Sequence, residues 1–395
     1  MSKQLRVLYA AGPGDVIGTY HYWINGEDDP SQVAVTYSAQ FYDVCSDLNA
    51  QGYIISSFTQ KGFLRDGRFT IEHRPVIWRS KSGLLYHFGQ IWYGLRLIIS
   101  AMRFQADVVF VVEGSTHLFV MTLLPYLGIE VVPVFQCVLW PEYQPPSKVN
   151  QLIWRLSHNL LEKSSFAIVV ISDTITKQIS QITGSQHKPI YKTLPYYRRD
   201  QFSDIKKPCK NRSLFYVLYA GRIEINKGVF DLLKIAIFFA SSSMRNIKFD
   251  VCGKGSELEN LKSAAKEAKV DSFFICHGHC DKLKMKEMFN RAHVVIAPTR
   301  TSFVEGLNKV VIEGVLSGRP VITSAVCPSF KMVENAVLEV PPNDLGAYRE
   351  AILKLYYNRE YYESKCQSCL KLQEKFYSYS NSWAATLTSI LTKIN

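Results

Sequence analysis

The sequence lacks any apolar run long enough to cross a membrane as a helix, which takes about 18 to 20 residues. The longest candidate, residues 91–102, is too short and is interrupted by Arg96. The apolar run behind Lys3 and Arg6 stops at Gly12-Pro13-Gly14, too early for the core of a signal peptide. We therefore expect a cytoplasmic protein, either soluble or peripheral on the inner face of a membrane.

Disulfide and repeat patterns are also missing. Nine cysteines, an odd number without regular spacing in 395 residues, are typical of reduced thiols in a cytosolic protein. The chain shows no repeat at solenoid spacing and no low-complexity tract. These absences argue against a disulfide framework and against an extended scaffold protein.

Acidic residues are fewer than basic ones. The chain has 46 Lys and Arg against 34 Asp and Glu, a formal charge of +12, which favours anionic partners such as nucleotides, phosphates or acidic lipid. No nucleic-acid recognition motif accompanies this charge, so we expect no nucleic-acid partner. A hydrophobic content of 47% with 20% charged residues is that of a packed globular protein of two or three domains.

Short apolar runs bounded by turn residues recur along the chain, with helix-length segments between most of them. This pattern is typical of buried parallel strands that alternate with helices. The first series comprises residues 5–10, 53–57, 107–112, 131–135 and 166–171, and the second comprises residues 214–220, 247–252, 272–276, 294–297, 320–323 and 337–340. The sequence therefore predicts an α/β protein of two doubly wound units.

The two series are separated by residues 194–211, which are rich in charge and turn formers and show little periodicity. We expect an N-terminal domain over residues 1–200, a C-terminal domain over 201–375, and a final helix within 376–395 that returns to the first domain. Open parallel sheets bind ligands at the carboxyl ends of their strands. Two such units in sequence suggest a cleft to which each contributes part of a ligand site.

The loop after residues 214–220 reads Gly221-Arg222-Ile-Glu-Ile-Asn226-Lys227-Gly and precedes an apolar helical run. Asn226 is predicted to cap that helix and Lys227 to begin it. A lysine in a first turn opposes the helix dipole unless an anion lies there, and Arg222 could reach the same point. The two residues predict a diphosphate site; the alternative is two solvated charges on a surface loop.

Two further loops contain residues that attract ligands. Gly253 and Gly255 follow a strand and would allow a ligand close to the backbone, although a plain tight turn is the more common use of such a pair. The run from Cys276 to Cys280 offers four metal ligands, including His279, but one chain turn rarely places four ligands tetrahedrally, so we predict no metal site.

The most informative segment runs from residue 298 to 320. It is predicted to be a strand end, a loop, a buried helix of about ten residues and a Gly-x-Pro turn. Backbone N–H groups of residues 306–309 would lie at the helix N-terminus, with Glu305 just before it and Glu313 one to two turns inside. Carboxylates there need partners such as sugar hydroxyls, although Glu313 could instead pair with Lys309 on the helix surface.

Together these loops resemble family-four glycosyltransferases of the GT-B fold. Glu305 to Glu313 matches that family's Glu-x7-Glu motif, and Gly221-Arg222, Lys227-Gly228, Gly253-x-Gly255 and Gly318-Arg-Pro320 follow in its order and spacing. The similarity covers residues 214–355. In the N-terminal half it is limited to strand order and the glycine-bearing loop Gly12-Pro-Gly14.

The resemblance implies two Rossmann-like domains and roles for individual residues. Arg222 and Lys227 would neutralise the donor diphosphate, Glu305 would hold hydroxyls of the transferred sugar, and Glu313 would accept hydrogen bonds from the ribose. Further donor contacts are implied for Gly14, Gly221, Gly253, Gly255, Gly306, Leu307 and Asn308, with His279 in the loop beside the nucleobase. Fixed cations and a helix terminus would stabilise the leaving group, so we expect no metal and no other cofactor.

The implied reaction moves a hexose from a UDP- or GDP-sugar to a hydroxyl of a glycan, glycolipid or lipid-linked acceptor, with retention of anomeric configuration. The pathway would be cell-surface polysaccharide or glycolipid biosynthesis. We assign no covalent nucleophile. The alternatives are a nucleotide-sugar epimerase or a phosphorylase of the same architecture, and a catalytically silent nucleotide-sugar-binding protein.

One position departs from the family pattern. Where the family usually has a histidine after the strand at residues 131–135, this chain has Gln136-Cys137, and glutamine cannot take a proton near neutral pH. His117 is the nearest substitute and a candidate catalytic residue, although a packing or capping role is the commoner one. Glu113 shares its loop, and we place Glu113 and Gln136 on the acceptor side.

Residues 61–103 contain eight Lys or Arg against two acids, interleaved with aromatic residues. A basic, aromatic surface can dock on anionic lipid headgroups. Residues 84–102 could equally be a core helix of the first domain. We expect either membrane contact or a buried helix there.

Overall fold

The computed structural model describes residues 4–77, 82–208, 213–242 and 244–394. Trp78, Arg79 and Lys81 of the basic aromatic segment lie outside this range, as do residues 209–212 of the expected domain connection. The chain forms two compact units. Unit 1 contains Met1–Cys137, Pro146–Tyr197 and Ser378–Asn395, and unit 2 contains Val138–Pro145 and Arg198–Tyr377.

Unit 1 is built on an eight-stranded sheet in the order β3-β4-β2-β1-β5-β6-β7-β8. Neighbouring strands are parallel except β3, which is antiparallel to β4. The strands are β1 Arg6–Ala10, β2 Gln51–Ser56, β3 Gly62–Asp66, β4 Phe69–His73, β5 Val108–Val112, β6 Glu130–Phe135, β7 Ile168–Val170 and β8 Ile190–Lys192. Strands β3, β4 and β8 were not predicted, because they are short and, unlike the central strands, only partly buried.

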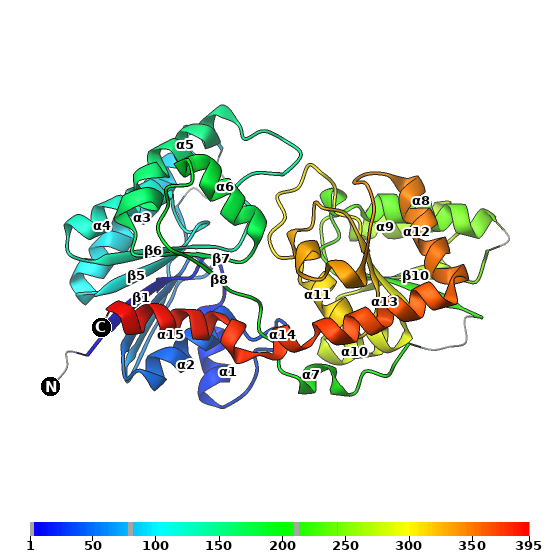
Figure 1. The fold of residues 1–395 in the computed structure, drawn as a ribbon, viewed down its shortest axis with the longest axis horizontal. Helices are drawn as coiled ribbons and strands as arrows, with labels where there is room; N and C mark the ends of the chain where they lie inside the picture. Colours follow the sequence, from blue (N-terminus) through cyan, green and yellow to red (C-terminus); the bar gives the residue numbers. More distant parts are fainter. Residues whose placement is uncertain (1–3, 78–81, 209–212, 243, 395) are drawn as a thin grey trace. The chain divides into compact units, whose positions relative to one another are not determined.

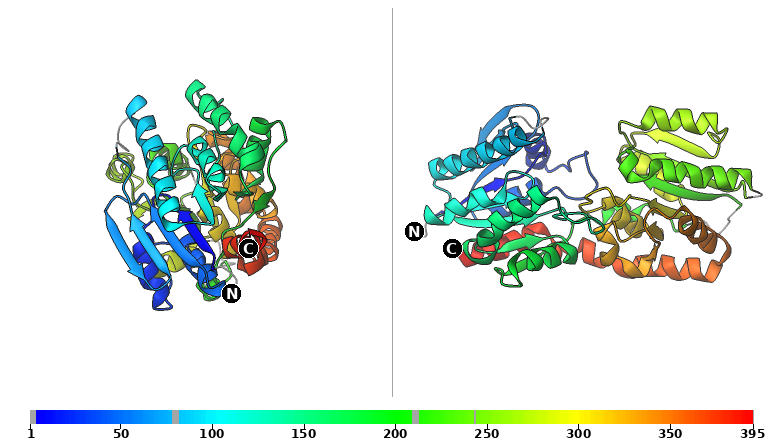
Figure 2. Two further views of the ribbon diagram at one scale, coloured as in Figure 1. Left: turned by 90° about the vertical axis from the view of Figure 1, so that its left-hand side faces the viewer. Right: turned by 90° about the horizontal axis from the view of Figure 1, so that it is seen from above.

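Helices cover both faces of this sheet (Figure 1). Helices α1, α2 and α15 supply the core on one face, where Trp383 of α15 is completely buried, and α3, α4, α5 and α6 lie on the other. Figure 2 shows α15, in red, within unit 1. The helices are α1 Val16–Ile24, α2 Tyr37–Asp47, α3 Leu84–Phe104, α4 Leu123–Tyr126, α5 Lys148–Asn159, α6 Asp173–Thr183 and α15 Trp383–Ile394, with the 3-10 turn η1 Leu118–Thr122 before α4.

Unit 2 is built on a six-stranded parallel sheet in the order β11-β10-β9-β12-β13-β14. This is the strand order of a dinucleotide-binding Rossmann fold. The strands are β9 Phe215–Ala220, β10 Ile247–Cys252, β11 Phe274–Gly278, β12 Val294–Ala297, β13 Val321–Thr323 and β14 Val337–Glu339. All six were predicted within two residues at each end, because each is a buried apolar run between turn formers.

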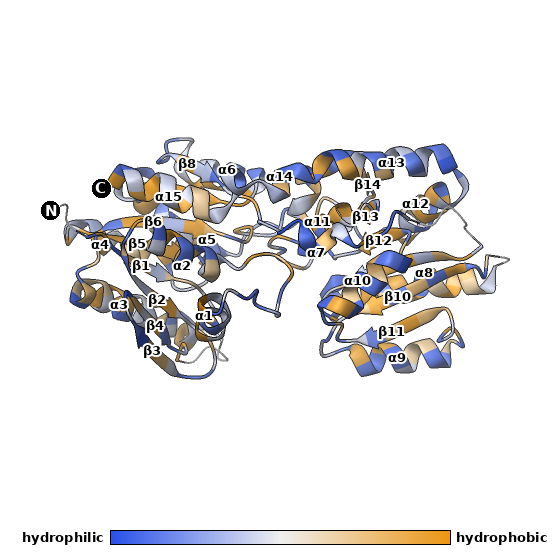
Figure 3. Cartoon of the chain, turned by 90° about the horizontal axis from the view of Figure 1, so that it is seen from below, coloured by the Kyte–Doolittle hydropathy of each residue, from blue (hydrophilic) through white to orange (hydrophobic). Residues whose placement is uncertain are grey.

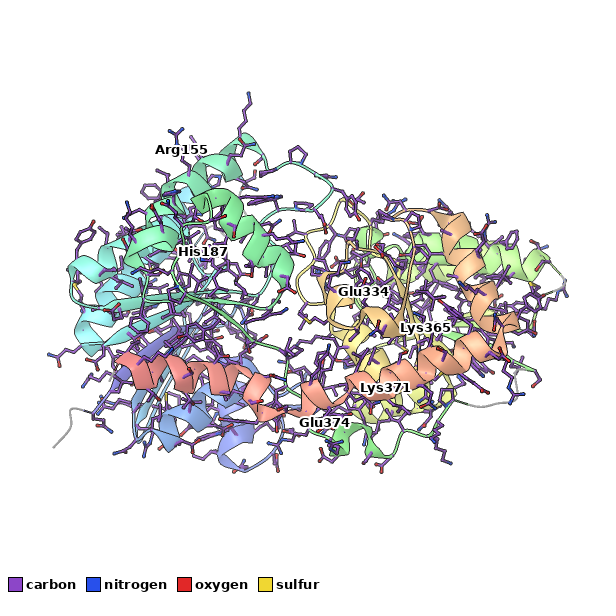
Figure 4. The ribbon with its side chains drawn as sticks, viewed as in Figure 1. Arg155, His187, Glu334, Lys365, Lys371 and Glu374 are labelled. Carbon is purple, nitrogen blue, oxygen red and sulfur yellow. The ribbon has the colours of Figure 1, made fainter. Side chains whose placement is uncertain are left out.

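Helices α8, α9 and α12 pack on one face of this second sheet, and α11 packs on the other. Gly314 lets α11 lie close to the sheet, since a Cβ there would be 3.0 Å from the side chains of Val295 and Val321. Lys365 of α13 donates to the carbonyls of Asn335 and Val337 beside β14 (Figure 4). The helices are α7 Asp200–Ser203, α8 Val229–Ser241, α9 Leu258–Glu267, α10 Lys282–Arg291, α11 Lys309–Leu316, α12 Leu345–Tyr357, α13 Arg359–Leu372 and α14 Glu374–Tyr377.

Hydropathy follows this layering (Figure 3). Orange segments run along strands such as β6 and β10, whereas α9 and α13 mix blue and orange, as helices with one solvated face do. Within the described residues, no helix combines the length and the hydropathy needed to traverse a bilayer.

Candidate functional site

In each sheet the strand order reverses at one point, and the loops after the two strands on either side of that point lie next to each other. In unit 2, β9 lies between β10 and β12, so the loops after β9 and β12 flank one crevice at the carboxyl ends of the strands. These are the loops that carry Arg222, Lys227 and Glu305. In unit 1 the equivalent loops follow β1 and β5, and the second of them carries Glu113.

Lys227 and Glu305 form a short, buried ion pair. Lys227 Nζ lies 2.6 Å from Glu305 Oε2, and the two side chains are 11% and 7% exposed. The same oxygen accepts hydrogen bonds from the Thr299 hydroxyl at 3.2 Å and from the Asn308 amide at 3.5 Å. The other oxygen, Oε1, accepts none from the described residues. A carboxylate accepts up to about four hydrogen bonds, so Oε1 retains capacity for the hydroxyls of a ligand.

Phe303 brings a second cation to this pair. The Lys227 ammonium lies 4.0 Å from the centre of the Phe303 ring, and the Arg222 guanidinium lies 5.3 Å from it. Arg222 is exposed and pairs with Glu224 at 2.8 Å. The ring attracts both cations through its face. Two positive charges from one loop are therefore held within reach of the same anion.

The helix after this loop begins later than predicted. Asn226 is not a helix cap: residues Ile225–Lys227 form a 3-10 turn, and α8 begins at Val229. The reason is Gly228, whose φ of +75° breaks the helical path and whose added Cβ would lie 2.0 Å from the Pro298 carbonyl oxygen. Lys227 consequently lies outside the first turn of α8, and its partner is the carboxylate of Glu305.

The glycines of the next loop are explained by contact with the chain itself. An added Cβ would lie 1.7 Å from the Gly221 carbonyl oxygen at Gly253, and 2.1 Å from the Ile223 carbonyl oxygen at Gly255. Ile223 N–H also donates to the Lys254 carbonyl at 2.9 Å. This turn therefore supports the loop that carries Arg222, and its contact with a ligand stays a prediction.

The second acidic residue of the motif lies inside α11. The helix begins at Lys309, and Asn308 precedes it without a side-chain capping hydrogen bond. The sequence placed residues 306–309 at the helix N-terminus, whereas Gly306 and Leu307 belong to the loop before the helix. Asn308 has an extended backbone, and its side-chain amide donates hydrogen bonds to Glu305 and to the Cys327 sulfur. Glu313 is the fifth residue of α11 and is half-buried.

The two histidines at the end of β11, His277 within the strand and His279 just after it, have different surroundings. His279 is exposed, whereas His277 Nε2 lies 2.7 Å from Asp250 Oδ1, and Arg291 shares that buried carboxylate. Among the described residues no group of three or more His, Cys, Asp or Glu side chains is placed to hold a metal ion. Asp250 therefore pairs with His277 and Arg291 in a local polar cluster near the loop of His279.

Glu113 and Gln136, placed on the acceptor side, come together in unit 1. The Glu113 carboxylate accepts the backbone N–H of Gln136 at 3.1 Å and that of Cys137 at 2.7 Å. Burial raises the pKa of Glu113 to about 7, and these N–H donors oppose that rise. The Gln136 side chain hydrogen-bonds Tyr9. Glu113 is therefore a carboxyl that changes charge near neutral pH at the carboxyl edge of the sheet.

His117 is engaged elsewhere. Its Nε2 lies 3.0 Å from His87 Nδ1, and its ring stacks on those of His87 and Phe119. Burial and the neighbouring His87 lower the pKa of His117 to about 4, so it is neutral and weakly basic at pH 7. These contacts give His117 a packing role, and its catalytic role stays a prediction.

The first loop of unit 1 contains two glycines with different surroundings. Gly14 is exposed and has open space where a Cβ would lie, while Gly12, with φ of +74°, is the residue that needs to be glycine. Asp15 caps α1 by accepting the Gly18 N–H at 2.7 Å. A carboxylate thus already occupies that helix terminus. A donor contact at Gly14 stays a prediction.

Several neighbours of Glu305 gave no signal in the sequence. Thr299 and Phe303 lie in the segment already singled out, but their contacts with Glu305 and Lys227 depend on how the loop folds. The segment Val138–Pro145 belongs to unit 2, where Val138 and Tyr143 line a cavity of about 10 Å³ with Glu305. That volume holds about one water molecule. The contribution of this segment could not be predicted, since it lies far from Glu305 in the sequence, among residues of unit 1.

The architecture matches that of glycosyltransferases of known structure. Sucrose-phosphate synthase from Thermosynechococcus elongatus superposes with a TM-score of 0.71 at 13% identity, over 99% of both chains. WaaG, a glycosyltransferase involved in lipopolysaccharide biosynthesis, gives 0.68 at 14% identity, over 98% of this chain and 100% of that one. HepE from Anabaena, solved in complex with UDP-glucose, gives 0.65 at 11% identity, over 99% of both. The fold is GT-B.

Sequence comparisons cover the second unit. Residues 200–371 match the family model of glycosyl transferases group 1. A stretch of 138 residues is 27% identical to the GtfA subunit of the UDP-N-acetylglucosamine–peptide N-acetylglucosaminyltransferase of Streptococcus gordonii, covering 35% of this chain and 25% of that protein. The alignment thus spans about a quarter of that relative's length. Together, the comparisons support a GT-B glycosyltransferase.

Proposed function

We propose that this chain is a retaining glycosyltransferase that moves a hexose from a UDP- or GDP-sugar to a hydroxyl group. The observation that carries this proposal is the Lys227–Glu305 pair at the strand switch point of unit 2, with Arg222 on the same phenylalanine ring and Glu305 Oε1 open. It lies within the residues that match the family model. The UDP-glucose complex of HepE and the name of the streptococcal relative favour a UDP-sugar.

The chemistry follows from the fixed charges. When the bond between the sugar and the diphosphate breaks, negative charge develops on the diphosphate, and Arg222 and Lys227 would stabilise it without reorganising. Glu305 would hold sugar hydroxyls through Oε1 while Oε2 stays bound to Lys227. Glu313 would accept from the ribose. These groups supply the stabilisation that a metal provides in other transferases, so transfer would proceed without one.

The acceptor site would lie in unit 1. Glu113, with a pKa of about 7, lies at that sheet edge beside Gln136 and titrates near neutral pH. We propose a hydroxyl of a glycan, glycolipid or lipid-linked acceptor, used in cell-surface polysaccharide or glycolipid biosynthesis. The enzyme would act in the cytoplasm, in contact with an anionic membrane surface through part of residues 61–103.

A donor panel tests the proposal. The protein is incubated with UDP-, GDP- and ADP-sugars, with and without chelator, and nucleotide release is measured. We expect release from at least one donor, undiminished by the chelator, and an α-linked product from an α-linked donor by NMR. Absence of binding and release with every donor contradicts the enzymatic function, and an inverted product contradicts retention.

Single substitutions in the pair then locate the site. Glu305→Gln should lower turnover by about 100-fold or more, because losing one group that binds the transition state in a fixed position costs about two to three orders of magnitude. The matched control is Glu334→Gln, which removes a carboxylate from an exposed Lys–Glu pair of the same unit, with Lys331 at 3.6 Å. We expect the control to keep wild-type turnover, and equal losses in both variants would remove the assignment.

A further inference from the structure

Helix α3 is apolar on two opposite faces. Its inner face contributes Tyr93, Leu97, Ile98 and Ala101 to the core of unit 1. Its outer face is exposed and continuous, since its residues recur every three or four positions: Phe88, Trp92, Leu95, Ile99 and Met102. Phe88 is 61% exposed and Trp92 is 47% exposed. A helix that packs only against its own sheet needs no such second face.

The neighbouring helices extend this apolar surface. The turn η1 contacts both α3 and α5, so the three elements adjoin, and α3, α4 and α5 lie on the same side of the sheet (Figure 1). We call the exposed apolar side chains of α3, α4 and α5, together with Leu127, the helical face. In addition to the five residues of α3 named above, the helical face contains Leu84, Leu85, Tyr86, Leu123, Tyr126, Leu127, Val149, Leu152 and Leu156. Exposed apolar side chains that gather on neighbouring helices mark interaction sites on proteins.

The helical face is also positively charged. Helices α3, α4 and α5 contain no Asp or Glu. Their cations are Arg96 and Arg103 on α3 and Lys148 and Arg155 on α5; the last is labelled in Figure 4. Arg103, Lys148 and Arg155 are exposed and form no ion pair with any described carboxylate. The first acid after α5, Glu162, pairs with His158 and Lys163.

We propose that the helical face lies flat on an anionic lipid bilayer. Apolar side chains would enter the boundary between headgroups and acyl chains, while the arginines and the lysine contact acidic headgroups. This inference deepens the membrane contact of the proposed function: it assigns the contact to α3 and adds α4 and α5. It does not depend on sugar transfer.

Two of the cations counted in residues 61–103 are not available to this surface. Arg74, one of the eight basic residues counted there, is buried and pairs with Glu72. Arg68 donates to the Cys45 carbonyl and to Asn49. These cations are used within the fold, whereas those of the helical face are not.

The charges disfavour a second copy of this chain as the occupant. A two-fold contact places the same patch of each copy against the other. The cations of one helical face would then meet those of its partner, and α3, α4 and α5 offer no carboxylate to pair with them, which costs free energy. An acidic bilayer supplies the missing negative charge.

Vesicle flotation of the full chain tests the proposal. The vesicles contain either phosphatidylcholine alone or phosphatidylcholine mixed with anionic phosphatidylglycerol. We expect the wild type to float with the acidic vesicles only. Trp92→Glu/Ile99→Glu should abolish flotation, and Arg103→Gln/Lys148→Gln/Arg155→Gln should weaken binding by about 100-fold, at about 1 kcal/mol for each cation. The matched control Phe63→Glu alters a residue of β3 that is 65% exposed and should change nothing.

The outcomes separate this surface from the proposed function. Absence of wild-type flotation, equal flotation with both lipids, or an equal loss in Phe63→Glu overturns the membrane assignment. A dimer in sedimentation that Trp92→Glu/Ile99→Glu disrupts, without flotation, assigns the face to a second copy instead. Nucleotide release from the donor, measured without lipid, should be unchanged in the variants. Flotation without any nucleotide release would leave the surface standing and remove the transferase.

Discussion

Breaking the Lys227–Glu305 pair should destabilise unit 2, and removing both charges should restore most of that loss. The atoms are 2.6 Å apart and the side chains nearly buried. Taking away one partner leaves the other charge unpaired in a low-dielectric site, which costs about 3 to 5 kcal/mol in fully buried pairs. Because Lys227 is 11% exposed, we expect about 3 kcal/mol for Lys227→Met or for Glu305→Gln. The double variant leaves no buried charge and should lie within about 1 kcal/mol of wild type.

Urea unfolding followed by circular dichroism measures these differences. Five of the six tryptophans, at positions 23, 78, 92, 154 and 383, belong to unit 1. Tryptophan fluorescence therefore reports mainly unit 1 and serves as the internal reference, while circular dichroism reports both units; Trp140 alone belongs to unit 2. The reasoning is refuted if each single variant costs no more than an ordinary surface substitution, which is about 0.5 kcal/mol. It is also refuted if the double variant loses the sum of the two single losses.

Three further predictions concern residues outside that pair. Gly228→Ala should lower the free energy of unfolding by more than about 2 kcal/mol, measured by thermal unfolding, since φ is +75° and the added Cβ meets a carbonyl at 2.0 Å. The control Gly26→Ala, where φ is +71° and the space is open, should lower it by about 1 kcal/mol. Equal losses in the two variants would contradict the close contact. Arg222→Ala should weaken nucleotide binding about tenfold in calorimetric titration without changing stability, because its side chain is 58% exposed; unchanged affinity would remove it from the site. Glu113 has a raised pKa of about 7, so its contribution to stability is present below its usual pKa of 4.5 and is lost as pH rises through 7. Glu113→Gln should therefore gain stability relative to wild type between pH 5 and pH 8, and a pH-independent difference would contradict the raised pKa.

The sequence predicted the strands of unit 2 well because each is a buried apolar run with a turn on either side. It also placed Lys227 and Glu305 in loops at the carboxyl ends of strands. Their direct contact could not be predicted between residues so far apart in the sequence, nor could the position of Phe303 beneath two cations. Both depend on the strand order, which brings the loops after β9 and β12 together.

The errors have local causes. The start of α8 was misplaced because Gly228 was taken as a helix residue, whereas its backbone is left-handed and lies against Pro298 in the loop after β12. The close packing of Gly253 and Gly255 against the loop that carries Arg222 could not be predicted, because it depends on how the two loops fold together. Arg74 was counted among the basic surface residues of 61–103, whereas it is buried in the fold and pairs with Glu72.

The most direct test of the central claim is the turnover of the Lys227→Met/Glu305→Gln double variant with the best sugar donor. This variant should unfold at nearly the wild-type urea concentration, so any lost activity cannot come from lost folding. The account predicts nucleotide release at least about 100-fold slower than wild type. A stable double variant that releases nucleotide at the wild-type rate would contradict the donor site assigned to unit 2.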